Sequence, residues 1–361
     1  MIVHQWDRGR GAEWSPVSEV FPGRTAAVTA DEAELARARD GDGAAFTRLV
    51  GPLRRELHAH CYRMLGSVHD AEDQLQETLI RAWRSYGKFE GRSSLRTWLY
   101  RIATNSCLRA LENRSRRPLP AGLGGPADPD GPLDPAAVEV PWLEPFPDVL
   151  LDAGSADPAA IVTSRQDVRL ALIAALQYLP GRQRSVLILR DVLMWRAAEV
   201  AQLLGISTVA VNSMLQRARI GLRDVAPMRD EVREPADVQQ RALVDQYAAA
   251  IENADVTALM GLLQADATFE MPPQSAWFLG REQIGRFLTS HVLREPGDLR
   301  TIPTSANGQP ALSVYQRTPD GAHHAHVLQV LTCTTAAVAR IVAFRNPGLF
   351  AAFGLPPELP S

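Results

Sequence analysis

The chain has 361 residues, which is long enough for two or three domains with a core each. Its hydrophobic content of 46% and charged content of 22% are ordinary for a water-soluble protein. No uninterrupted apolar run approaches the roughly 18 residues that a membrane span needs, and the N-terminus lacks the apolar core of a signal peptide. The three cysteines are too widely spaced for a disulfide framework or a metal motif. We therefore expect a cytoplasmic protein with no membrane partner, no metal and no cofactor.

The net charge of −3 hides a strong division of charge along the chain. Residues 37–117 hold 16 Lys and Arg against 9 Asp and Glu, a balance of +7, and residues 161–223 hold 9 against 3, a balance of +6. Between them, residues 118–164 hold 8 acidic residues and no basic one. Two basic segments with helical periodicity indicate a nucleic-acid partner more than a membrane surface, which would favour one continuous amphipathic helix.

Residues 1–30 carry Gly, Pro and Ser without periodicity, so we expect a disordered arm there. The pattern then becomes helical, with a break expected at residues 41–43 and apolar residues at three- and four-residue steps through residues 44–64. The stretch SVHDAEDQLQETLIRAWRSY, residues 67–86, predicts a further amphipathic helix. Its polar face is either ordinary solvated surface or a surface that docks on a basic groove of a partner protein. The side chains of this face are Asp70, Glu72, Asp73, Gln74, Gln76 and Glu77.

Residues 88–117 combine aromatic rings and arginines on one expected helix, with Ser94 as its N-cap, and on the loop before it. This combination suits unpaired nucleic acid, because bases stack on rings and phosphates bind guanidinium groups. The alternative is a core helix with a solvated basic side, and Trp98 by itself is more typical of a core residue. The rings are Phe89, Trp98 and Tyr100, and the arginines are Arg92, Arg96, Arg101, Arg109, Arg114, Arg116 and Arg117.

Residues 118–160 predict an extended, disordered linker, because residues 118–158 include ten prolines and several glycines. Its interior, WLEPFPDVLLD, is unusually apolar for a plain spacer. Large apolar side chains favour burial, so we expect this part to follow a surface or to dock in a groove. These side chains are Trp142, Leu143, Phe146, Val149, Leu150 and Leu151.

Residues 161–228 return to a helical pattern, and RAAEVAQLLGISTVAVNSMLQRARIGLR has the spacing of a helix-turn-helix. Ala201 permits close approach of the two helices and Gly205 allows the sharp turn. Polar side chains on the second helix can read base edges and hold phosphates; the alternative is an ordinary helical hairpin. The candidate DNA-binding residues are Ser207, Thr208, Asn212, Ser213, Gln216, Arg217 and Arg219.

Residues 236–352 change in character, with helices first and strand-like runs later, which predicts an α+β cone or barrel with a pocket. His324 and His326 would share a strand face, but two histidines without a placed carboxylate are weak evidence for a metal. An enzyme would need a positioned acid or base, and no Asp-His pair is visible, which favours a regulatory module. The polar candidates for the pocket are Tyr247, Glu270, Trp277, Arg281, His323, His324 and His326.

Together, these segments resemble a bacterial sigma-70-type RNA polymerase sigma factor of the extracytoplasmic-function class. HDAEDQLQETLIRAW resembles the family's polymerase-clamp helix, and FEGRSSLRTWLYRIATNSCLRAL resembles its promoter −10 region. LPGRQRSVLILRDVLMWRAAEVAQLLGISTVAVNSMLQRAR resembles its −35 region. The tail, with ENADVTALMGLLQADATFEMPP and WFLGREQI, is similar to the SnoaL-like branch of the NTF2-like fold, and WLEPFPD resembles a linker motif of sigma factors that carry this domain.

The resemblance implies a multidomain fold. Two all-α sigma domains, a helical bundle and a helix-turn-helix, would be joined by a disordered linker and followed by a C-terminal α+β NTF2-like cone. The implied boundaries are 31–117 for sigma region 2, 118–160 for the Pro-rich acidic linker, 161–228 for sigma region 4 and 236–352 for the SnoaL-like domain.

The resemblance also implies a function: the chain would bind core RNA polymerase and direct promoter-specific initiation, with no catalytic residue. The clamp-binding residues would be Asp70, Glu72, Asp73, Gln74 and Glu77. The −10 DNA-binding residues would be Phe89, Arg92, Ser93, Ser94, Arg96, Trp98, Arg101, Asn105 and Arg109, with Asn105 near the opened bases. The candidates of the helix-turn-helix would read duplex −35 DNA, although Asn212 stands where many members have a basic residue.

Two alternatives stay open from the sequence. One is a helix-turn-helix regulator that acts without core polymerase, and the other is a C-terminal domain with its own enzymatic activity. An anti-sigma factor, or a small ligand at the C-terminal domain, is a further candidate partner.

Overall fold

The computed structural model describes residues 33–112, 114–133, 135–137, 139–151, 167–223, 237–335 and 337–360. The expected arm at 1–30, the end of the expected linker at 152–160 and residues 224–228 lie outside these residues. Contacts divide the chain into two compact units, Met1–Gly51 and Pro52–Ser361.

In the first unit, α2 (Gly43–Val50) begins at the N-cap Asp42, so the break expected at residues 41–43 is confirmed. The Asp42 carboxylate accepts the amide hydrogen of Ala45 over 3.0 Å and also contacts Arg37. The bond from Ala45, followed by the one from Arg37, holds the pKa of Asp42 below its usual value. Arg48 at the end of α2 pairs with Glu34 at 3.0 Å.

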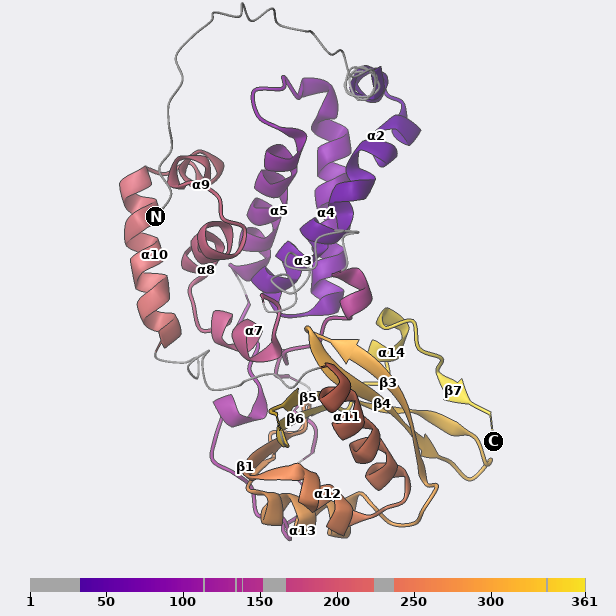
Figure 1. Cartoon of the computed structure of the whole chain (residues 1–361). Coiled ribbons are helices and arrows are strands. Elements are labelled where there is room, and N and C mark those ends of the chain that lie inside the picture. The colour runs from indigo at the N-terminus through magenta and orange to yellow at the C-terminus, as the bar shows by residue number, and fades with distance from the viewer. Residues whose placement is uncertain are drawn as a thin grey trace, which may run out of the picture. The chain divides into compact units, whose positions relative to one another are not determined.

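The second unit begins with a helical bundle. A 3-10 turn, η1 (Gly51–Leu53), contains Pro52 and interrupts the helical pattern expected through residues 44–64, because proline lacks the amide hydrogen that a continuing helix needs. The helices α3 (Arg54–Leu65), α4 (Val68–Ser85) and α5 (Leu95–Leu111) pack against one another, and η2 (Tyr86–Lys88) follows α4 (Figure 1). Ser94 caps α5 as predicted, and its hydroxyl accepts the amide of Thr97 over 3.1 Å.

The described part of the linker has little regular structure beyond the turns η3 (Pro120–Gly122) and η4 (Asp148–Leu150). Its apolar interior is nevertheless docked: Leu143 and Phe146 are completely buried, and Trp142 and Leu151 nearly so. The prediction of docking is therefore confirmed for these four side chains, whereas Val149 is exposed.

The predicted helix-turn-helix is also confirmed. The helices α7 (Leu170–Leu176) and α8 (Gly181–Leu187) and the π-helical turn η5 (Ile188–Val192) precede α9 (Ala197–Leu204) and α10 (Thr208–Arg223). The last two meet at 101°, within the range of this motif, and Gly205 takes the left-handed conformation, φ 66°, at their turn. In the described part of the chain, no single helix is long and apolar enough to cross a membrane, and only this bent pair passes that test when counted together.

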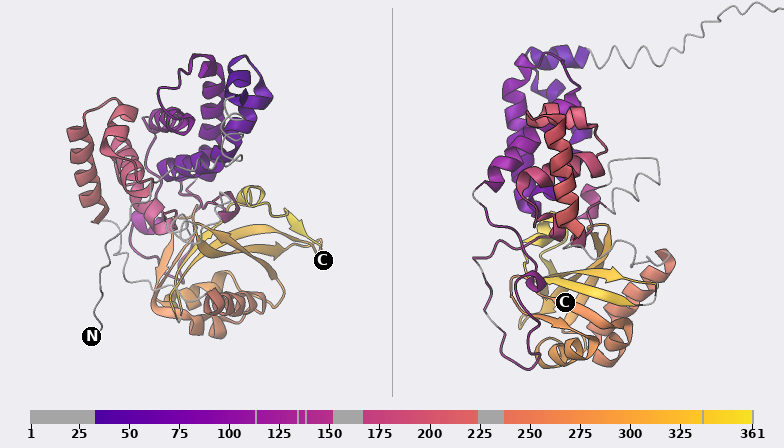
Figure 2. Two further views of the ribbon diagram at one scale, coloured as in Figure 1. Left: turned by 45° about the horizontal axis from the view of Figure 1, so that its top comes forward. Right: turned by 90° about the vertical axis from the view of Figure 1, so that its left-hand side faces the viewer.

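The C-terminal part is a curved mixed sheet with helices, as expected (Figure 2). The helices α11 (Asp237–Glu252) and α12 (Val256–Leu262) lead into β1 (Leu263–Glu270) and β2 (Trp277–Leu279), and α13 (Arg281–His291) follows. The later elements are β3 (Leu299–Ala306), β4 (Gln309–Arg317), β5 (His323–Cys333), β6 (Val338–Phe344), α14 (Leu349–Ala352) and β7 (Glu358–Leu359).

The strand order is β2-β1-β6-β5-β4-β3, with β7 paired to β5. The pair β1 and β6 is parallel and the other pairs are antiparallel. Helices α11 to α13 lie on one face of the sheet (Figures 1 and 2), and an apolar cluster that includes Phe269, Phe278 and Phe287 fills the space between them.

Candidate nucleic-acid and partner interfaces

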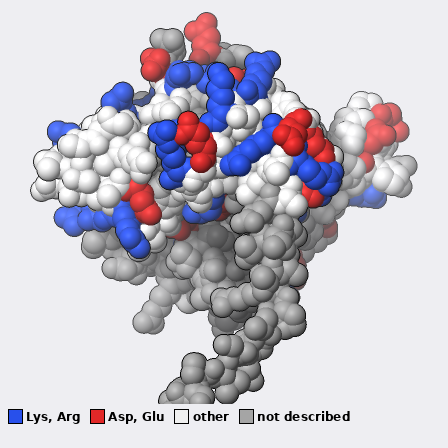
Figure 3. All heavy atoms as spheres, turned by 90° about the horizontal axis from the view of Figure 1, so that it is seen from above, with Lys and Arg blue, Asp and Glu red and all other residues white. Residues whose placement is uncertain are grey.

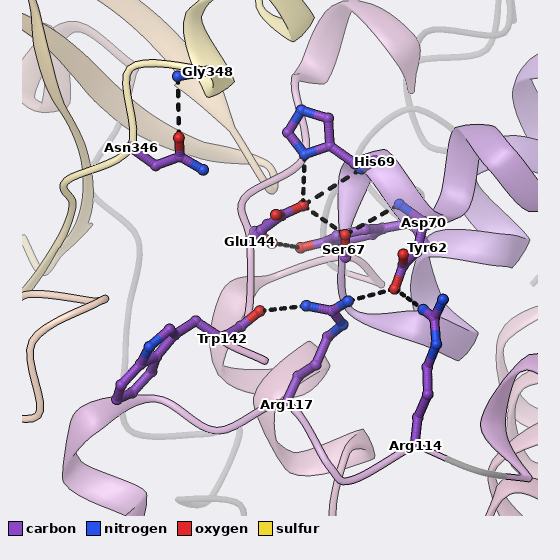
Figure 4. A network of polar contacts seen from close by, with 10 residues as sticks. All are labelled: Tyr62, Ser67, His69, Asp70, Arg114, Arg117, Trp142, Glu144, Asn346 and Gly348. Carbon is purple, nitrogen blue, oxygen red and sulfur yellow. Dashed lines mark hydrogen bonds and ion pairs between the residues drawn. The ribbon is translucent and has the colours of Figure 1, made fainter. Parts of the chain in front are cut away.

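The acidic face predicted on α4 is present, but several of its charges already have partners within the chain. Asp70 contacts both Arg114 and Arg117, which follow α5 (Figure 4). Glu72 pairs with Arg54 at 2.9 Å. The predicted side chains of this face, which range from half-buried to exposed, are Asp70, Glu72, Asp73, Gln74 and Glu77.

Two large apolar side chains on the same helix were missed from the sequence. Ile80 is 45% exposed and Trp83 is 38% exposed. They follow Gln76 at helical spacing and so continue the polar face rather than the buried one. That spacing was the available signal, because large apolar groups on an otherwise polar helix face mark contact surfaces.

The outer side of α5 carries a stripe of predicted DNA-binding residues. Arg101, Asn105 and Arg109 are all exposed and stand four residues apart, so they share one helix face. Asn105 and Arg109 also line a surface groove of about 400 Å³, together with Arg182 of α8. This groove brings two guanidinium groups and one amide together beside the Glu112 carboxylate, and the excess of positive charge suits a phosphodiester chain.

A half-buried ring on the loop before α5 covers a buried ring of that helix. Phe89 is half-buried and packs on Trp98 and Tyr86, with ring centroids 4.9 and 5.9 Å apart. Trp98 is buried behind it, so packing is its main role here, as the sequence favoured. Arg92 is exposed and paired with Glu90 at 2.5 Å, while Ser93 is half-buried and Ser94 is exposed.

Arg96 and Tyr100 differ from the expectation of an open aromatic and basic surface. Tyr100 is completely buried, so its ring does not offer a stacking face. The Arg96 guanidinium is 2.9 Å from the Glu56 carboxylate and lies over the rings of Tyr100, at 4.9 Å, and Trp195, at 5.9 Å. Trp195 stands just before α9, so the helix-turn-helix reaches the predicted −10 helix at this point.

The second helix of the helix-turn-helix exposes the predicted −35 residues. The Ser207 hydroxyl accepts the amide hydrogen of Ala210 over 3.1 Å and caps α10. Arg219 is held by Asp191 of η5 through two bonds of 2.7 and 2.9 Å, which raise the Arg219 pKa. The remaining exposed members are Thr208, Asn212, Ser213, Gln216 and Arg217. Figure 3 shows Lys and Arg side chains on the face that it draws, with Asp and Glu side chains among them.

Glu144 ties the linker to the turn between α3 and α4 (Figure 4). Its carboxylate accepts from the Ser67 hydroxyl at 2.6 Å and lies 3.0 Å from Nδ1 of His69. Its amide donates to the carbonyl of Gly66 over 3.0 Å, and its carbonyl accepts from the Tyr62 hydroxyl over 2.8 Å. Gly66 has φ 70°, and a Cβ there would lie 2.8 Å from Leu143, so glycine is required for this docking.

The tip of the β3–β4 hairpin meets three other segments through Asn307, which is completely buried. Its side-chain amide donates to the Tyr62 hydroxyl over 2.8 Å and to the Val168 carbonyl over 2.6 Å. Its side-chain oxygen accepts the amide hydrogen of Phe146 over 2.8 Å. One residue of the C-terminal domain therefore bonds to α3, to the linker and to the chain just before α7.

The candidate polar residues of the cone are not gathered into one pocket. The Tyr247 hydroxyl donates to Gln329 over 2.9 Å, and burial raises the Tyr247 pKa. His323 is buried beside the Gly297 carbonyl, whereas His324 and Arg281 lie nearer to solvent. His326 is half-buried and its pKa is lowered by burial. Among the described residues, no group of three or more His, Cys, Asp or Glu side chains could hold a metal ion.

Glu270 and Trp277 bind the linker instead. Glu270 is 1% exposed, and its carboxylate accepts from Arg340 at 2.8 Å and from the amide of Ala121 at 3.0 Å. The Trp277 indole donates to the Gly124 carbonyl over 2.9 Å. These contacts fix the first part of the linker to β1, β2 and β6.

Comparisons with known proteins match three separate parts of the chain. Residues 49–117 match the Sigma-70 region 2 family, residues 169–220 match Sigma-70 region 4, and residues 239–333 match the Nuclear transport factor 2 domain. The ECF RNA polymerase sigma factor SigG of Mycobacterium tuberculosis is 52% identical over 90% of this chain and 87% of its own. SigJ of the same species is 28% identical over 67% of this chain and 72% of its own. The crystal structure of SigJ superposes with a TM-score of 0.56 at 24% identity and covers 84% of this chain and 98% of that one.

Proposed function

Because the chain belongs to the extracytoplasmic-function family of RNA polymerase sigma factors, we propose that its NTF2-like domain regulates its activity through contacts with the linker and both sigma domains. The chain binds core RNA polymerase and directs promoter-specific initiation, through sigma regions 2 and 4. The reading as a regulator that acts without polymerase is thereby set aside.

The observation that carries this proposal is the position of Asn307. A buried amide that satisfies all its hydrogen bonds in three different segments is costly to expose, because each lost partner leaves a desolvated polar group. The NTF2-like domain thus stabilises one arrangement of sigma region 2, linker and sigma region 4. An arrangement held in this way shifts the population of states that can bind polymerase.

In the same arrangement, residues with expected roles in initiation are engaged within the chain. Asp70, expected on the polymerase clamp, contacts Arg114 and Arg117. Arg96, expected at −10 DNA, is bonded to Glu56 and lies near Trp195. We assign the polymerase-binding role to the α4 face, the −10 role to Phe89 and the α5 stripe, and the −35 role to α10. On this assignment, initiation requires Asp70 and Arg96 to change partners.

We also propose that the NTF2-like domain acts without catalysis. Its interior is a closely packed apolar cluster, and its buried carboxylate, Glu270, is neutralised by Arg340 and bonded to the linker. A general acid or base must reach a substrate, and Glu270 is covered in this arrangement. An anti-sigma protein or a small ligand of this domain stays a prediction.

The test compares the full chain with a chain that ends at Pro235, in core-polymerase binding and in run-off transcription. Loss of the domain removes Asn307, and we expect the shorter chain to bind core polymerase at lower concentration, because its competent state is more populated. The full-length variant Asn307→Ala should shift binding in the same direction. Identical binding and transcription by all three chains, together with turnover of a ligand by the isolated domain, would instead favour an enzyme.

A further inference from the structure

Val209, the second residue of α10, is 72% exposed although it is apolar. It begins a stripe of uncharged side chains on one face of the helix, since Asn212, Ser213 and Gln216 follow at three-, four- and seven-residue steps and are all exposed. The opposite face of α10 is the one that packs, with Val211, Leu215 and Ala218 buried. The exposed position of Val209 therefore adds little to the core.

Local preferences give no reason for valine at this site. A β-branched residue is a weaker helix former than alanine, and its exposed methyl groups gain nothing from water. The neighbouring positions Ser207 and Thr208 are polar and exposed, so the first turn of α10 is otherwise a solvated surface. The Val209 side chain is therefore available for a contact outside the chain.

The first turn of the second helix is the part of a helix-turn-helix that meets base edges in the major groove. Phosphates are held by cations, which here lie further along α10 at Arg217, Arg219 and Arg223. Four hydrogen-bonding patterns distinguish the base pairs in the major groove, but the one apolar group that a normal base presents there is the C5 methyl of thymine. Val209 matches this group in chemistry, and Asn212 and Gln216 beside it match adenine.

We propose that Val209 is a specificity-determining residue that reads a thymine methyl group in the −35 element. The contact is apolar, so it discriminates thymine from uracil, which differs only by that methyl. It is separate from the contacts of the NTF2-like domain, and a failure here leaves the proposed regulation untouched.

The test uses the full chain bound to core polymerase. A −35 element is first selected from duplex promoters that are randomised at this position, and each thymine in it is then replaced by uracil. At one or two thymines we expect affinity to fall about four-fold, which corresponds to burial of one methyl group, about 0.8 kcal/mol. A selected element without thymine, or equal affinity for every uracil duplex, would overturn the proposal.

Variants then locate the methyl contact on the protein. Val209→Ala should bind the thymine duplex several-fold more weakly and lose most of the uracil penalty, because the Cγ methyl groups that contact the thymine methyl are gone. Ile220→Ala is the matched control, since Ile220 is another exposed apolar residue on α10, three turns further along. It should retain the full uracil penalty. If Val209→Ala also retains it, the methyl is read by another residue and the assignment fails.

Discussion

The side-chain amide of Asn307 donates to the phenol oxygen of Tyr62 over 2.8 Å, although the two residues lie 245 positions apart in the chain. Replacing Asn307 by alanine removes this bond and leaves Phe146 with an unpaired buried amide. We expect a loss of about 2 to 4 kcal/mol in the free energy of unfolding, measured by urea titration. Asn307→Asp keeps the acceptor but loses both donors, so its loss should also be large.

A matched control separates this junction from a general effect of amide removal. Asn253→Ala removes an exposed side-chain amide that donates to the carbonyl of Ala249 near the end of α11. We expect a change within about 0.5 kcal/mol. Equal losses for the two alanine variants would mean that Asn307 does not hold the segments together.

His60 gives the stability of sigma region 2 a dependence on pH. It is completely buried beside the Thr104 hydroxyl, and burial, followed by Arg63 and Arg96, lowers the pKa of His60 to about 3. In the unfolded chain its pKa is about 6.5, so between pH 6.5 and about 3 the unfolded chain holds the extra proton. The free energy of unfolding should therefore fall as pH falls, by up to about 1.4 kcal/mol per pH unit from this group.

Urea titrations at pH 7, 6 and 5 measure this slope. His60→Gln cannot bind the proton and keeps a side-chain donor near Thr104, so its slope should be smaller by this amount. The pKa of His58 is lowered by burial as well, so some slope of the same sign should persist. If this variant keeps the slope of the original chain, the pKa of His60 does not differ between the folded and unfolded states, and the prediction is wrong.

Met194 stores backbone strain before the helix-turn-helix. Its φ is 56° and its side chain is 78% exposed, so the side chain gains little burial in return for a conformation that glycine adopts freely. Met194→Gly should raise the free energy of unfolding by about 0.5 to 1 kcal/mol, seen as a higher thermal midpoint. Met194→Ala retains the strained φ and serves as the control, with no comparable gain. A midpoint lowered by glycine would contradict the assignment of strain.

The features that the sequence predicts correctly are those that local spacing determines. The Ser94 hydroxyl caps the first turn of α5, and this signal depends only on neighbouring residues. The spacing of Ala201 and Gly205 likewise indicates a helix-turn-helix from local sequence alone. The sequence predicts that Phe146 is buried, because a large apolar side chain favours burial. It does not predict the partners Tyr62 and Asn307, which are distant in sequence. No local pattern identifies such partners.

The sequence predicts least well the surroundings of residues on and between the β-strands. Asn307 and Gly308 both have positive φ, 59° and 65°, and form the Asn-Gly hairpin turn that such a pair signals, yet the pair does not reveal that its amide is buried. Glu270 was expected in the pocket of the cone. It lies next to Phe269 on β1 and therefore points to the opposite face of the sheet, where Arg340 and the linker cover it.

The pair of Glu270 and Arg340 makes a prediction that separates domain stability from linker attachment. Arg340→Ala leaves the Glu270 carboxylate, which is 1% exposed, with its bond from the Ala121 amide but without the Arg340 guanidinium. We therefore expect a loss of about 3 kcal/mol or more in the free energy of unfolding. Replacing both residues by methionine removes the buried charge as well as its partner. That double variant should recover most of the loss, because apolar groups of similar volume suit a buried site.

Attachment of the linker should not recover in the double variant, because methionine cannot accept the hydrogen of the Ala121 amide. Hydrogen exchange at Ala121 should therefore be faster than in the original chain even where unfolding is restored. Arg286→Ala, which breaks the exposed contact between Arg286 and Asp130, is the control and should change stability by less than about 0.5 kcal/mol. Slow exchange at Ala121 in the double variant would mean that the Trp277 contacts hold the linker alone, and that the Glu270 carboxylate only balances Arg340.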